Sequence, residues 1–78
     1  MERKKQPRLV ITFHTTTDAM RMEAYCTPEL GRLIPVPRDI SAGCGLAWSA
    51  DPQSEDTLLR VMAENKIKYQ EKKVVLLY

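Results

Sequence analysis

The chain has 78 residues and a formal net charge of +2, and 44% of its residues are hydrophobic and 28% charged. These values are typical of one small globular domain, and no apolar run approaches the ~20 residues that a membrane span requires. Two cysteines and one histidine cannot fill a four-ligand zinc site, and no C-x-x-C pair exists, so one chain alone holds no structural zinc.

The N-terminus is basic, with Arg3, Lys4, Lys5 and Arg8 in its first eight residues. We assign residues 1–8 to a flexible basic tail and residues 9–78 to a single α+β domain, which is slightly acidic without the tail. The apolar run after the tail is too short for the core of a signal peptide, so we expect a cytoplasmic protein.

Residues 9–13 are rich in β-branched and aromatic side chains and predict a buried strand. A helix should begin directly afterwards, because Thr15 and Asp18 have the spacing of a capping box. This helix should end near Thr27, since a residue that precedes a proline is displaced from helical geometry.

Residues 33–36 predict a second strand, and Pro35 and Pro37 place it at a sheet edge because proline cannot donate to a strand ladder. Residues 46–48 form a short third strand. Asp51 and Pro52 then predict a second helix start, an acceptor cap followed by proline.

Asn65 is a plausible left-handed end for this second helix. Residues 73–78 form the last strand, which Ile67 and Tyr69 could lengthen. Because this strand is apolar, it could pair with a second copy, and both a monomer and a homodimer are compatible with the sequence.

The element order is therefore βαββαβ. The simplest compact arrangement is a ferredoxin-like sandwich, with a four-stranded antiparallel sheet and two helices on one face. Right-handed crossovers place the third strand between the second and the first, and the fourth on the other side of the first.

Cys44 lies between Gly43 and Gly45 in the turn between the second and third strands. Glycine permits positive φ angles, and neither neighbour has a side chain that could block access to the sulfur. A reactive cysteine and a bystander thiol in a glycine turn are both compatible with this spacing.

The predicted topology brings this turn to the same edge as His14, Thr15, Thr16 and the start of the first helix, and Arg38 lies in the turn itself. Helix N–H groups favour an anion and lower the pKa of a nearby thiol. We therefore predict an anion-binding edge in which Cys44 is a solvent-reachable thiolate.

The remaining cysteine, Cys26, lies at the far end of the first helix, about 15 Å away at ~1.5 Å per residue. A disulfide with Cys44 is therefore not expected. We interpret Cys26, Trp48 and the methionines as core residues, and Arg32 as a solvated residue at a strand start.

Residues 11–20, 31–38 and 40–48 resemble the Putative Se/S carrier protein-like family of small bacterial proteins, and the resemblance extends over about residues 9 to 70. It implies that Cys44 carries sulfur or selenium as a persulfide or selenopersulfide. A cysteine desulfurase would donate the cargo and an acceptor protein would receive it, without a cofactor or a metal. The chain would then be a carrier rather than a free-standing enzyme.

The alternative is a non-catalytic module that binds a small anion or a protein at the same edge, with an incidental cysteine. RNA binding is disfavoured, because the strands lack paired exposed aromatic side chains and the domain is not basic.

Overall fold

A computed structural model describes residues 5–37, 40 and 45–77 of the chain. The elements are β1 (Gln6–Thr12), α1 (Thr16–Tyr25), the 3₁₀ turn η1 (Pro28–Leu30), β2 (Arg32–Pro35), β3 (Leu46–Ala50), the 3₁₀ turn η2 (Pro52–Ser54), α2 (Glu55–Glu64) and β4 (Glu71–Leu77). Within these residues, neither helix has the length and the apolar composition needed to cross a membrane.

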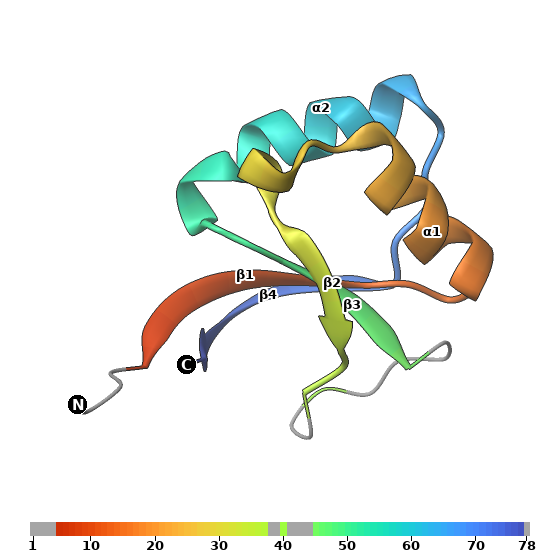
Figure 1. The fold of residues 1–78 in the computed structure, drawn as a ribbon. Helices are drawn as coiled ribbons and strands as arrows, with labels where there is room; N and C mark the ends of the chain where they lie inside the picture. Colours follow the sequence, from red (N-terminus) through yellow and green to blue (C-terminus); the bar gives the residue numbers. More distant parts are fainter. Residues whose placement is uncertain (1–4, 38–39, 41–44, 78) are drawn as a thin grey trace.

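The four strands form one sheet in the order β2-β3-β1-β4, and each neighbouring pair is antiparallel. Both helices lie on the same face of this sheet (Figure 1). The predicted α+β class is thus confirmed, and β3 lies between β2 and β1 as the crossover rule requires. The proline-containing strand β2 is at an edge of the sheet, as predicted.

Strand β1 begins at Gln6, three residues before the predicted start at Leu9. The prediction that residues 6–8 belong to a flexible tail was therefore wrong. Proline is tolerated at position 7 because the pairing of β1 with β3 begins only at Leu9, so this part of β1 pairs with β4 alone.

Helix α1 begins as predicted. The Thr15 hydroxyl accepts a hydrogen bond from the Asp18 backbone N–H at 3.2 Å and donates one to the Asp18 carboxylate at 3.0 Å. Asp51 likewise accepts from the Gln53 N–H at 2.9 Å. The chain after Asp51 first forms the turn η2, so α2 starts three residues later than the cap itself suggests.

The end of α2 differs from the prediction. Asn65 has φ −104°, and the left-handed residue is Lys66 with φ 55°. Both the backbone and the side-chain N–H groups of Asn65 donate to the Val61 carbonyl, which holds Asn65 in the last helical turn. Arg21 of α1 then donates to the carbonyls of Asn65 and Lys66, where the chain reverses.

Strand β4 begins only at Glu71, so Ile67 and Tyr69 do not lengthen it. Ile67 is buried in the main core, and its N–H donates to the Met62 carbonyl at 2.8 Å. Its apolar side chain therefore serves the helical layer rather than the sheet.

The main core lies between the helices and the sheet, and Trp48 is almost completely buried at its centre. The Trp48 indole N–H donates to the Leu30 carbonyl at 3.2 Å, so its polar atom is satisfied. Met22 and Met62 are also buried, but Met20 is 50% exposed. The interpretation of Met20 as a core residue was wrong, because that position of α1 points away from the sheet.

A smaller apolar cluster covers the helix-free face of the sheet. Its buried members are Val10, Ala47 and Ile40, of which Ile40 comes from the connection between β2 and β3. Ile40 therefore packs onto the face that the helices leave open.

Candidate functional site

The ends of three strands define the edge at which the sequence predicts a site. Thr12, at the end of β1, pairs with Ala47, which in turn pairs with Ile34 near the end of β2. The connection between β2 and β3, residues 36–45, therefore leaves the sheet at the end where β1 stops and α1 begins. For the described residues, this is the juxtaposition that the topology predicts.

Both ends of the 36–45 connection are held together. The Val36 N–H donates to the Gly45 carbonyl at 3.0 Å, which closes the connection at its base. Within it, Ile40 is only 7% exposed and packs with Val10 and Ala47. The connection is thus anchored at its two ends and at one point between them.

Gly45 has φ 76°, so the positive φ predicted for a glycine beside Cys44 is present on its C-terminal side. Apart from its neighbours in the chain, no described residue has an atom within 4 Å of a Cβ atom added at Gly45. Cys44, Gly43 and Arg38 lie outside the described residues, and their predicted roles stay predictions.

His14, Thr15 and Thr16 are all exposed where β1 passes into α1. Within the described part of the chain, Thr15 has the capping role given above, whereas His14 and Thr16 form no side-chain hydrogen bond. The first N–H groups of a helix lack intrahelical partners and can hold an anion. Asp18 adds a negative charge to this turn and so weakens its attraction for anions.

Cys26 lies just after α1, at the end of the helix opposite the 36–45 connection. Its sulfur is 3.9 Å from the Met22 sulfur and packs against the main core, as predicted. Burial raises the pKa of the Cys26 thiol, so Cys26 stays protonated at neutral pH. This cysteine is therefore a poor nucleophile and is not part of the candidate edge.

Metal ligation has no support within residues 5–37, 40 and 45–77, where no three His, Cys, Asp or Glu side chains gather. The described part of the candidate edge offers hydroxyls, an imidazole and helix N–H groups. These groups suit an anion better than a metal ion.

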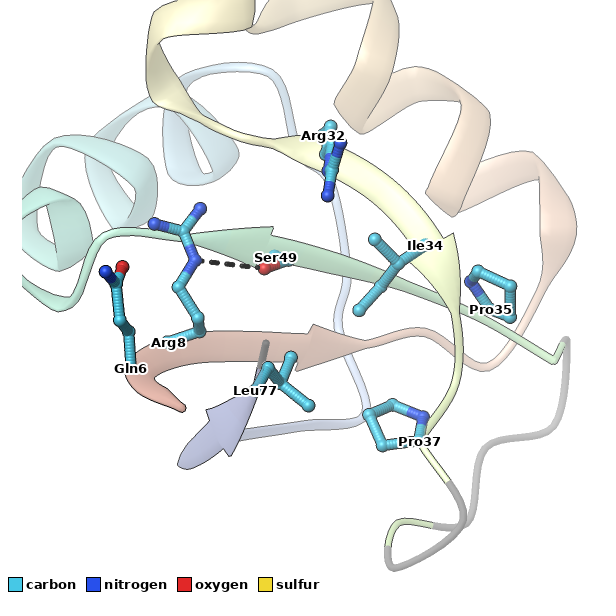
Figure 2. A pocket seen from close by; sticks show the side chains of 8 residues that line it. All are labelled: Gln6, Arg8, Arg32, Ile34, Pro35, Pro37, Ser49 and Leu77. Carbon is cyan, nitrogen blue, oxygen red and sulfur yellow. Dashed lines mark hydrogen bonds between the residues drawn. The ribbon is translucent and has the colours of Figure 1, made fainter. Parts of the chain in front are cut away.

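A cavity of about 470 Å³ lies on the helix-free face, and Arg8, Arg32 and Ser49 lie together in it (Figure 2). This cavity was not predicted from the sequence. Arg8 was assigned to the tail and Arg32 to a solvated strand start. Only the alternation of side chains along β1, β2 and β3 could have placed the three on one face, and this requires the register between strands.

Comparison with known proteins gives one match. The family model described as Putative Se/S carrier protein-like matches residues 8–72, which is most of the chain. No curated protein and no solved structure shows a significant match. The match begins within β1, includes both helices and the 36–45 connection, and ends at the start of β4. On this basis the chain belongs to the Putative Se/S carrier protein-like family.

Proposed function

We propose that this chain is a sulfur or selenium carrier that holds its cargo on Cys44 as a persulfide or selenopersulfide. The observation that carries the proposal is the family match over residues 8–72, which includes the 36–45 connection. The strand register supports it, since both ends of that connection lie where α1 begins.

Each transfer is a thiol exchange that needs no external oxidant. The Cys44 thiolate attacks the terminal sulfur of a donor persulfide, a new S–S bond forms, and the donor cysteine leaves as a thiolate. An acceptor thiolate removes the terminal sulfur by the same step. Electrons balance because one S–S bond is made for each one broken.

The two cysteines are suited to different roles. A carrier thiol must be reachable and ionised near neutral pH. The exposure of Gly45, the residue that follows Cys44, supports the proposed access. Cys26 is half-buried with a raised pKa and lies at the opposite end of α1. Cys26 therefore would not remove the cargo as an intramolecular disulfide.

The proposed donor is a cysteine desulfurase, and the proposed acceptor is a protein that takes up sulfur or selenium. The proposed compartment is the cytoplasm, where thiols stay reduced.

The test of the carrier function is incubation of the full chain with a cysteine desulfurase and cysteine, followed by mass spectrometry. We expect one added sulfur in wild type and Cys26→Ser and none in Cys44→Ser. An adduct that persists in Cys44→Ser would contradict the assignment.

A second measurement tests whether the Cys44 thiol is ionised near neutral pH. In a Cys26→Ser background, the alkylation rate of Cys44 against pH should give a pKa below the free-cysteine value of about 8.5. His14→Ala should raise this pKa if the imidazole supports the thiolate.

A Cys44 pKa at or above the free value, together with absence of the adduct, would favour an anion- or protein-binding module. In such a module Cys44→Ser keeps binding and Arg38→Ala loses it.

A further inference from the structure

The cavity on the helix-free face of the sheet has a volume of about 470 Å³. Its size is within the range of small-molecule sites in proteins. One side is lined by Arg8, Arg32 and Ser49, and the other by Ile34, Pro37 and Leu77 (Figure 2). The lining therefore combines a polar, cationic part with an apolar part.

The two arginines converge on Ser49. Arg32 is the direct cross-strand partner of Ser49, and Val10, the partner of Ser49 on β1, lies two residues from Arg8 on the same face. The Arg8 Nε donates to the Ser49 hydroxyl at 3.3 Å, which orients its guanidinium on the sheet. Ser49 is only 5% exposed, so this contact is well shielded from water.

Neither guanidinium forms an ion pair with a carboxylate of the described residues. The Arg8 contact uses its Nε, so its two terminal nitrogens have no partner within the described part of the chain. Two guanidinium groups beside each other attract an anion, and arginine binds carboxylate and phosphate groups through paired hydrogen bonds.

The apolar side favours a ligand that has an apolar body over a simple inorganic anion. Ile34 and Leu77 present aliphatic surface, and Pro37 adds a rigid ring. Burial of a ligand's own apolar surface against this wall would add to its affinity. We propose that this cavity binds a small organic anion in which a carboxylate or phosphate group is joined to an apolar body.

This site goes beyond the carrier function and does not require Cys44. Pro37 nevertheless belongs both to the cavity wall and to the 36–45 connection. A ligand in the cavity would therefore contact the segment that bears the proposed carrier cysteine.

The test uses the ¹⁵N-labelled full chain and four probes. Hexanoate and phenyl phosphate combine an anionic group with an apolar body, inorganic phosphate has only the charge, and hexanol has only the apolar body. We expect saturable shifts of the Arg8, Ser49 and Leu77 amides with at least one of the two organic anions. That anion should bind at least tenfold more tightly than both inorganic phosphate and hexanol, and comparing hexanoate with phenyl phosphate identifies the preferred head group.

Variants make the test specific. Arg32→Gln removes an exposed cation from the cavity lining and should weaken binding at least tenfold. Arg60→Gln makes the same charge change on the exposed side of α2 and should leave binding unchanged, as should Cys44→Ser. The proposal is overturned if no probe gives saturable shifts, if inorganic phosphate binds as tightly as the organic anions, or if Arg60→Gln weakens binding as much as Arg32→Gln.

Discussion

At the scale of single residues, Gly31 shows the strongest requirement for one amino acid. It joins η1 to β2 with φ 132° and ψ −164°, a region of backbone space that is essentially restricted to glycine. A Cβ atom there would also lie 2.6 Å from the Trp48 Nε1 atom and overlap the Ser49 carbonyl oxygen. Backbone geometry and close packing therefore both exclude a side chain.

We expect Gly31→Ala to lower the free energy of unfolding by about 2–4 kcal/mol, because backbone strain and overlap with β3 both destabilise the variant. The matched control is Gly45→Ala, which also has positive φ but open space around the added atom. It should cost only about 1 kcal/mol. Urea denaturation of both variants measures the difference, and equal losses would show that packing against Trp48 contributes nothing.

Individual residues also differ in how well the sequence predicted their structural roles. The positive φ of Gly45, the capping role of Thr15 and the burial of Cys26 are local consequences of residue type, and each is confirmed. The prediction that Met20 is a core residue was wrong. Its spacing fits an apolar stripe, but the orientation of α1 on the sheet leaves its side chain half exposed.

At the scale of elements, the start of α1 is the feature that connects local sequence with the proposed site. Thr15 satisfies the Asp18 N–H, and α1 then runs away from the end of the sheet where the 36–45 connection lies. The orientation of the helix N-terminus depends on this cap.

Thr15→Ala should therefore reduce the free energy of unfolding by about 1 kcal/mol, the usual cost of losing an N-cap hydroxyl. Thr17→Ala is the control, because Thr17 is exposed in the same turn and forms no hydrogen bond through its side chain within the described residues. It should change stability by less than about 0.5 kcal/mol. Thermal or urea unfolding followed by far-UV circular dichroism would measure both, and an equal effect of the two substitutions would refute the capping role.

The end of α2 shows the limit of local patterns at this scale. An Asn after a helix is a common left-handed stop, yet Lys66 takes that conformation. The Arg21 side chain, more than forty residues away in sequence, donates to the carbonyls on both sides of the reversal. A contact from another helix thus stabilises the reversal at Lys66, which the local sequence does not reveal.

At the scale of the whole molecule, the sheet buries its two faces in different ways. The helices cover one face with a continuous core that includes Leu58, Met62 and Trp48. Among the described residues between β2 and β3, Ile40 and Val36 pack against the other face. At the β4 edge, Leu76 is 61% exposed.

We expect Leu58→Ala, at a site with 0% exposure, to cost about 2–5 kcal/mol because it opens a cavity between α2 and the sheet. Leu76→Ala removes the same atoms from an exposed edge and should cost about 1 kcal/mol or less. Urea denaturation of the two variants tests this asymmetry. A large loss for Leu76→Ala that depends on protein concentration would instead indicate that β4 pairs with a second copy, as its apolar sequence permits.

The sequence by itself determined the order of the helices and strands, the cap at the start of α1, which strand lies at an edge, and the family to which the residues around Cys44 point. These features depend on residues a few positions apart, such as Thr15 with Asp18, and on the alternation of side chains within one strand. Only the tertiary structure brought Arg8, Arg32 and Ser49 into one cavity and placed Ile40 over the open face. The physical reason is that register between strands is set by packing and turn geometry over the whole sheet, and a shift of one residue would move these side chains to the opposite face.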